Sequence, residues 1–347
     1  MTLFVASARA IGAGLALAFL GASHAAAFCT NPDALGVSRV LAVDTSHGLE
    51  VGRSQYPQSL PLQPKEVVLT FDDGPAPGTE AILRALEDQC VKATFFIVGA
   101  RATLYPHLVE ATAAAGHTIG THSQNHPLNL QLRPAEDGIR EINDGIASVA
   151  KALGHPPAPF FRFPGLGHTR AMRAYLAGIG AGVFGIDAEG GDWLGLLGPD
   201  RIRARSIAQL KEHDGGILLL HDPLRNTAAM LPDLLRDLKA QGFRIVHVVP
   251  AGSVSAAYAA AAAATPPRAI ALAAAQQTPA VTPTALRPQP ALSLVPATTT
   301  AAPRATTAVA TRPAAPALFT AVPAVAPAAA RPSAPTAPFL TPTTGDD

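Results

Sequence analysis

The sequence VVLTFDDGP at residues 67–75 decides how this chain folds. Its first half is an apolar run typical of a buried strand, and two carboxylates, Asp72 and Asp73, follow where that run ends. Charged groups are costly to bury and are not placed at such a position for stability. Two of them at a strand end therefore indicate a site that needs carboxylates. The alternative is that Asp72 and Asp73 cap a helix that begins near Pro77.

Downstream of this strand, short apolar runs alternate with longer segments of helical pattern. The expected strands cover residues 66–71, 93–98, 118–120, 160–163, 183–186, 216–220 and 243–248. The expected helices cover residues 80–87, 102–115, 134–153, 169–177, 201–213 and 228–241. This alternation predicts parallel strands joined by right-handed crossovers. About seven such units favour a (β/α) barrel, with an open α/β sheet as the alternative.

The sequence HSQNH at residues 122–126 places two imidazoles four residues apart. A pair such as His122 and His126 is also common on protein surfaces, so the spacing alone does not identify a site. Combined with one carboxylate from Asp72-Asp73, the pair gives one oxygen and two nitrogen ligands, a set that suits a divalent metal. The other carboxylate would be free to act as a base. The pattern therefore points to metal-assisted hydrolysis.

The remaining candidate groups also lie at the carboxyl ends of expected strands. Arg162 closes the fourth strand, residues 187–193 follow the fifth, and His221 ends the sixth. Barrels and open α/β sheets both place their active sites at that edge. Polar residues scattered at random would not gather there, so we interpret them as one site.

Five segments of the chain resemble, in order, the five motifs of the polysaccharide deacetylases. They are TFDDGP at 70–75, HSQNH at 122–126, RFPG at 162–165, DW at 192–193 and LLH at 219–221. The resemblance covers roughly residues 64–250. It implies a distorted (β/α) barrel and hydrolysis of N-acetyl groups, or sometimes O-acetyl groups, on polysaccharides.

The resemblance also implies a role for the groups around the metal. Asp73, His122 and His126 would hold the ion, with zinc as the first choice and cobalt, manganese or nickel also suited to the ligand set. Asp72 would be the base that deprotonates water. Arg162 would keep this carboxylate charged and oriented.

Further groups match the family around the substrate. His221 would be the general acid, and Asp192 would keep its imidazole protonated. Trp193 and Leu219 would line a pocket for the acetyl methyl group. Alternatives stay open: His221 as a polar stop after a buried run, Leu219 as a core residue, and Ser123 as either a hydrogen-bonding support for the site or a plain turn residue.

The chain departs from the family pattern at two places. The third motif usually has an aromatic residue where this chain has Gly165, which keeps a backbone N–H for the oxyanion but offers no ring for stacking on sugar. The fourth motif contains two more carboxylates, Asp187 and Glu189, and either is an alternative to Asp192.

Composition divides the chain into four parts. Residues 1–27 resemble a secretory signal peptide, with an uncleaved membrane anchor as the alternative. Residues 28–64 are expected to form an irregular N-terminal arm, and residues 65–250 the catalytic domain. Residues 251–347 hold almost half of the 33 prolines and few large apolar groups, so disorder is expected there. An Ala-rich helix at residues 255–264 is compatible with the sequence.

Export makes the two cysteines informative. In an oxidising compartment, Cys29 and Cys90 are expected to pair, and two free thiols are the alternative. A net charge of +1 gives no attraction to nucleic acid. We expect a monomer in the periplasm or outside the cell, with no membrane span after signal cleavage. Its substrate would be an N-acetylated polysaccharide or oligosaccharide: peptidoglycan, a chitin-like polymer or poly-N-acetylglucosamine. An O-acetyl esterase and an inactive carbohydrate-binding protein are the competing hypotheses.

Overall fold

Strand β3 (Glu66–Asp72) lies within the sheet, and all 7 of its residues are buried. It pairs in parallel with β4 (Thr94–Ile97) and with β9 (Gly215–His221). The ladder continues from β4 through three more parallel strands: β5 (Thr118–Thr121), β6 (Phe160–Phe161) and β7 (Gly182–Phe184). These strands and the helices between them form the distorted (β/α) barrel that the sequence predicts.

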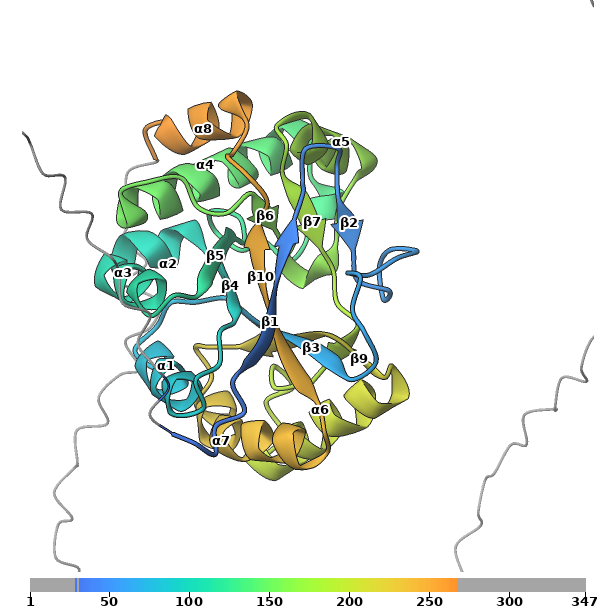
Figure 1. The fold of residues 1–347 in the computed structure, drawn as a ribbon. Helices are drawn as coiled ribbons and strands as arrows, with labels where there is room; N and C mark the ends of the chain where they lie inside the picture. The colour runs from blue at the N-terminus through green and yellow to red at the C-terminus, as the bar shows by residue number, and fades with distance from the viewer. Residues whose placement is uncertain (1–28, 30, 267–347) are drawn as a thin grey trace, which may run out of the picture. The chain divides into compact units, whose positions relative to one another are not determined.

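The computed structural model describes Cys29 and residues 31–266. Within these residues, helices connect the strands and cover the outside of the sheet (Figure 1). The helices are α1 (Thr79–Asp88), α2 (Gly99–Leu104), α3 (Pro106–Ala114), α4 (Ala135–Leu153), α5 (Arg170–Gly178), α6 (Pro199–Glu212), α7 (Arg225–Ala240) and α8 (Ala256–Ala263), with 3₁₀ turns at Leu130–Leu132 and Pro164–Leu166. None of the helices in this part of the chain has both the length and the apolar character needed to cross a membrane.

The alternation of side chains along β3 decides which groups enter the barrel. Leu69 and Phe71 belong to the core cluster that packs beneath α1 and α7. Val68 belongs to a separate cluster built from strand residues inside the barrel. Because successive side chains of a strand point to opposite faces, Thr70 and Asp72 share the inner face with Val68. The sequence therefore places one carboxylate, Asp72, at the inner mouth of the barrel.

The N-terminal segment contributes strands to the sheet, so the prediction of an irregular arm over residues 28–64 is wrong. β1 (Val37–Val43) pairs in parallel with β10 (Arg244–Pro250), which begins beside β3. β2 (Glu50–Val51) pairs in parallel with β7. Exposed positions alternate with half-buried ones along most of β1, and β2 has only 2 residues, so neither strand forms a continuous apolar run.

Residues 52–59 fill the gap between β7 and β8 (Ala188–Glu189), two strands that do not pair with each other. The Ser54 N–H donates to the carbonyl of Ile186 at 3.0 Å, and the Ile186 N–H donates to Gln55 Oε1 at 2.8 Å. β8 itself pairs with β9. The N-terminal segment thus completes the barrel wall next to the strands that carry the fourth and fifth motifs.

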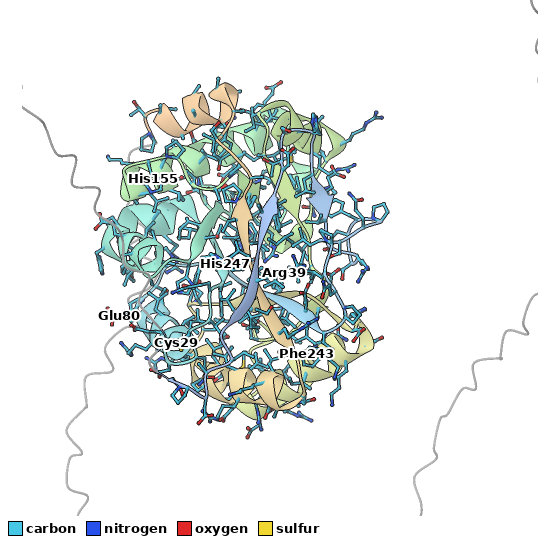
Figure 2. All side chains as sticks on the ribbon, in the orientation of Figure 1. Cys29, Arg39, Glu80, His155, Phe243 and His247 are labelled. Atoms are coloured by element: carbon cyan, nitrogen blue, oxygen red, sulfur yellow. A yellow bond between two sulfur atoms is a disulfide. The ribbon has the colours of Figure 1, made fainter. Side chains whose placement is uncertain are left out.

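Cys29 and Cys90 form a disulfide, with their Cα atoms 5.6 Å apart. Cys90 lies just after α1, and Cys29 lies beside that helix in Figure 2. The neighbouring Asn31 donates from Nδ2 to the carbonyl of Asp88 at 2.9 Å. The start of the described chain is therefore fastened to the end of α1 by both covalent and hydrogen bonds.

Helix α8 packs against α4 (Figure 1), so the domain boundary predicted at residue 250 is wrong. Tyr258 is 1% exposed, and its hydroxyl donates to the carbonyl of Ala158 at 2.9 Å. The Ser255 hydroxyl caps the helix by accepting the Tyr258 N–H at 3.0 Å. The folded domain includes α8 because the side chain of Tyr258 packs in the hydrophobic core. The signal-peptide prediction over residues 1–27 and the predicted disorder of residues 267–347 lie outside the described residues.

A chain that ends at Pro250 is expected to be less stable than one that ends at Pro266, because only the shorter chain loses α8. Loss of a buried aromatic side chain costs about 3 kcal/mol. For a domain of this size, that loss lowers Tm by roughly 6–12 °C. Circular dichroism melts of both truncations and of residues 28–347 measure the effect. The truncation at Pro266 is expected to have the same Tm as residues 28–347. Equal Tm values for all three chains would show that α8 contributes no stability.

Candidate active site

The candidate groups meet at the carboxyl edge of the barrel because each follows or ends a parallel strand. Asp72 ends β3, His122 directly follows β5, and His221 ends β9. Arg162 follows β6, and Asp192 lies three residues beyond β8. Parallel strands bring their carboxyl ends to one edge, so residues far apart in the sequence become neighbours.

Asp73, His122 and His126 form a potential metal-binding cluster, and their ligand atoms all lie within 4.8 Å of one another. Asp73 Oδ1 is 3.4 Å from His122 Nε2 and 2.9 Å from His126 Nε2. His122 is buried, whereas the Asp73 and His126 side chains are about one-third exposed, at 34% and 27%. The cluster therefore combines one buried side chain with two side chains that are partly open to solvent.

The residues of this cluster fit a divalent metal in two ways. His122 Nδ1 lies 2.7 Å from the carbonyl oxygen of Arg162, which can only accept, so Nδ1 carries the proton and Nε2 is left as a ligand. Asp73 Oδ1 is a buried oxygen. Although it lies close to both Nε2 atoms, it has no partner with hydrogen-bond geometry among the described residues. One carboxylate and two imidazoles form a set typical of zinc and similar metals.

Asp72 is held by a buried arginine. Arg162 Nη1 donates to Asp72 Oδ1 at 2.7 Å and to Thr70 Oγ1 at 2.8 Å. The other guanidinium nitrogens donate to the carbonyls of Phe184 and Gly185 at 3.2 and 3.0 Å. Arg162 is fully buried, so its position is fixed by these bonds. The buried guanidinium therefore also fixes the orientation of the Asp72 carboxyl group.

The second carboxylate oxygen of Asp72 faces the cluster of Asp73, His122 and His126. Asp72 Oδ2 lies 3.7 Å from His122 Nε2, whereas its other oxygen is occupied by Arg162. The two adjacent carboxylates are therefore held apart by different partners. Asp72 and Asp73 are thus adjacent in the sequence but bonded to different groups.

His221 and Asp192 form a second charged pair at the same edge. The His221 Nδ1–H donates to Asp192 Oδ1 at 2.8 Å, and the His221 backbone N–H donates to Asp192 Oδ2 at 2.7 Å. The hydroxyl of Thr227 also donates to Asp192 Oδ2, at 2.6 Å. Burial alone lowers the pKa of His221, but the hydrogen bond and charge of Asp192, with the charges of Asp72 and Asp73, raise that pKa to about 9. The imidazole is consequently protonated at neutral pH.

Asp187 and Glu189, the two alternatives to Asp192, are bonded elsewhere. Asp187 accepts the backbone N–H groups of Arg53 and Ile217, both at 2.8 Å, so it joins the N-terminal segment to β9. Glu189 accepts from Arg205 at 2.5 Å. Of the three carboxylates, Asp192 is the one that contacts His221.

The residues matched to substrate contacts lie in different surroundings. Leu219 is 6% exposed in β9, whereas Trp193 is 56% exposed in the loop after β8. Gly165 has a left-handed backbone with φ of 58°, and a side chain there would first meet Leu128 Cδ2, at 3.4 Å from the Cβ position. Leu128 is itself 66% exposed, so an aliphatic side chain lies where a ring on residue 165 would project.

Sequence reasoning missed several groups that support the site. Thr70 and Thr227 bond to Arg162 and Asp192, and neither residue type stands out in its segment. Asp222 is 1% exposed and contacts Thr79. Burial and the charge of Asp73 raise the pKa of Asp222 to about 7. In the sequence, the position of Asp222 directly after His221 is the one indication that it lies near the site.

Comparison with known proteins gives consistent similarities. A family model described as "Polysaccharide deacetylase" matches residues 60–183. The chain is 33% identical over 195 residues to a peptidoglycan-N-acetylglucosamine deacetylase of Bacillus cereus, a match that covers 54% of this chain and 89% of the relative. It is 30% identical over 187 residues to a peptidoglycan-N-acetylmuramic acid deacetylase of Bacillus subtilis, where it covers 53% of this chain and 38% of the relative.

A solved structure extends the similarity to the fold. A peptidoglycan deacetylase of Bdellovibrio bacteriovorus superposes with a TM-score of 0.57 and 32% identity, covering 64% of this chain and 61% of that one. The chain thus spans 38% of the Bacillus subtilis relative and 61% of this solved structure.

Proposed function

Because the chain belongs to the polysaccharide deacetylase family, we propose that it is a metal-dependent hydrolase that removes N-acetyl groups from a polysaccharide. One observation carries this proposal. A cluster of one carboxylate and two imidazoles shares the barrel edge with an arginine-paired carboxylate and a carboxylate-paired imidazole. Together these groups supply a metal site, a base and an acid, which are the parts that amide hydrolysis requires.

The first half of the reaction uses the groups on β3 and after β5. Asp73, His122 and His126 would hold the divalent ion, which when bound polarises the acetyl carbonyl and acidifies water. Asp72 takes the proton from the attacking water with its free oxygen. Arg162 holds the orientation of Asp72, because it occupies the other carboxylate oxygen.

The second half uses the pair after β8 and at the end of β9. His221 donates a proton to the amine nitrogen as the carbon–nitrogen bond breaks, so that a neutral amine leaves. Asp192 holds the imidazole in its protonated form through Nδ1, which leaves Nε2–H as the donor. By resemblance to the family, the Gly165 N–H would face the carbonyl oxygen, and Trp193 and Leu219 would contact the acetyl group.

We propose peptidoglycan as the first substrate to test, since the relatives named above act on it by name. A chitin-like oligosaccharide is the second. Zinc is the proposed metal on ligand type. We also propose that the protein acts outside the cytoplasm, on the basis of the signal-like sequence at residues 1–27 and the disulfide between Cys29 and Cys90.

Purified residues 28–266 are expected to bind one divalent ion per chain, and His122→Ala and His126→Ala are each expected to lose it. Each substitution removes one of the three ligands, so the ion would be left with only two. Metal content measured by mass spectrometry after dialysis tests this directly. Acetate release from peptidoglycan and from N-acetylglucosamine oligomers, with and without chelator, tests the activity on the same samples.

The matched control is His213→Ala, which removes an exposed imidazole after α6 and should keep both the metal and the activity. Full metal content in both ligand variants would contradict the metal site. A loaded enzyme that releases acetate from neither substrate would contradict the proposed substrates.

A further inference from the structure

The loop that carries both histidines has an unusual backbone. Ser123 and His126 adopt left-handed conformations with φ of 61° and 55°, a region that non-glycine residues rarely occupy. Such conformations persist only where the surrounding structure enforces them. Within the loop, one bond contributes: the His126 N–H donates to Ser123 Oγ at 3.1 Å. The remaining constraints come from outside the loop.

The first external constraint is the start of α2. The Gly99 N–H donates to the carbonyl of Ser123 at 2.9 Å, and the Ala100 N–H donates to the carbonyl of Gln124 at 2.8 Å. These two bonds hold the carbonyl side of the loop. Its N–H groups face the other way.

The second constraint is Glu141, on α4. Its Oε2 accepts the backbone N–H groups of Gln124 and Asn125 at 3.1 and 2.8 Å, and its Oε1 accepts Asn125 Nδ2 at 2.8 Å. A carboxylate that accepts three N–H bonds makes a strong, charge-assisted clamp. Among the described residues, Glu141 has no hydrogen bond or ion pair with the three proposed ligand side chains. Its partners are the two residues directly before His126.

The same face of α4 approaches the loop at two more positions. A Cβ on Gly145 would lie 2.6 Å from the carbonyl carbon of Ser123, so only glycine lets the helix come this close. Ser148 donates to Gln124 Oε1 at 2.8 Å. Residues 141, 145 and 148 lie on one helical face, since they are spaced by four and three residues. The helix is therefore in contact with the loop over two turns.

We propose that Glu141 is a positioning residue for the metal site, acting through the backbone of residues 124–125 to set His126 against Asp73 and His122. The inference rests on the proposed function, because it concerns the metal that the function requires. Loss of the carboxylate removes three hydrogen bonds from one short loop, while the side chains of Asp73, His122 and His126 are all still present. Loss of a supporting group of this kind lowers metal affinity by roughly 10–100-fold.

Glu141→Ala is therefore expected to weaken zinc binding about 10–100-fold in competition with a chromophoric chelator. The Co²⁺-loaded variant should have an altered visible absorption spectrum, because His126 is displaced. Saturating zinc should restore kcat, since the base and the acid are unchanged. The matched control is Glu136→Ala, which removes an exposed carboxylate from the same helix and should leave affinity and spectrum as in the wild type.

Glu141→Gln keeps an oxygen for the two backbone N–H groups, and rotation of the Asn125 amide would let its oxygen accept from the new NH₂ group. We therefore expect partial rescue, with an affinity between those of the alanine variant and the wild type. This variant keeps the test decisive if Glu141→Ala does not fold. Wild-type zinc affinity and Co²⁺ spectrum in whichever Glu141 variant folds would overturn the inference. A wild-type protein that binds no metal would instead overturn the proposed function.

Discussion

Asp72→Asn is expected to retain its metal and to lose about 10²–10⁴-fold in turnover, because an amide cannot take a proton from water. The substitution preserves the shape of the side chain. Its oxygen can still accept from Arg162, which now donates to Asp72 Oδ1 at 2.7 Å. The proposed metal ligands Asp73, His122 and His126 are unchanged. Acetate release at saturating substrate, measured with the metal content of the same sample, separates loss of the base from loss of the ion.

The same change leaves the fully buried Arg162 without its charge partner. Removing one partner of a buried ion pair destabilises a protein by about 3–5 kcal/mol. The Asp72→Asn variant should therefore also melt at a lower temperature, and its activity must be measured well below that Tm. Asp200→Asn, at a side chain that is 90% exposed, is the control for the substitution itself. Near-normal turnover in a metal-loaded Asp72→Asn protein would mean that another group accepts the proton.

The core strands were predictable because most of them are short runs rich in apolar residues. β9 and β10 correspond to the runs at residues 216–220 and 243–248, and the other five expected strands are also present. The structure adds β1, β2 and β8. β1 shows partial burial in alternation, and β2 and β8 have 2 residues each, so their pairing depends on the rest of the barrel. Local sequence carries no signal for such strands.

The prediction of one continuous helix over residues 102–115 is wrong. The structure divides this region into α2 and α3, with Tyr105 between them at φ of −128°. Pro106 explains the break, because proline lacks an N–H and disfavours a helical conformation in the residue before it. Proline is well suited to the first turn of the new helix, which is where Pro106 lies.

The candidate site was predictable to the extent that its groups end strands. Asp72, Arg162 and His221 could be placed at one edge from the order of strands and helices alone. Their supporting contacts could not be placed in this way. Glu141 reaches the histidine loop from the middle of α4, and Thr227 reaches Asp192 from α7, so both contacts arise from packing between distant segments. No motif marks either residue. The catalytic and ligand roles themselves remain predictions.

His221→Gln is expected to separate the two hydrolytic activities that the sequence leaves open. On an N-acetyl substrate we expect a loss of about 10²–10⁴-fold, because the amine nitrogen has no proton donor as it leaves. On an acetyl ester the loss should be far smaller, since an alkoxide leaves more readily than an amine anion. Parallel assays on N-acetylglucosamine oligomers and acetylated xylan measure both rates in one preparation. His213→Gln, at an exposed position, is the control for the substitution.

The pH dependence gives a second readout of the same imidazole. The pKa of His221 is raised to about 9, so its acid form persists through neutral pH and is lost as the pH rises through that value. A bound divalent cation repels the imidazolium and moves this loss to lower pH. The wild-type rate on the amide should therefore fall on the alkaline side, at or below a pH of about 9, and His221→Gln should lack that fall. An equal loss on amide and ester, with the alkaline fall unchanged, would show that His221 supports the fold of β9 and donates no proton. The polar-stop interpretation of His221 would then be the correct one.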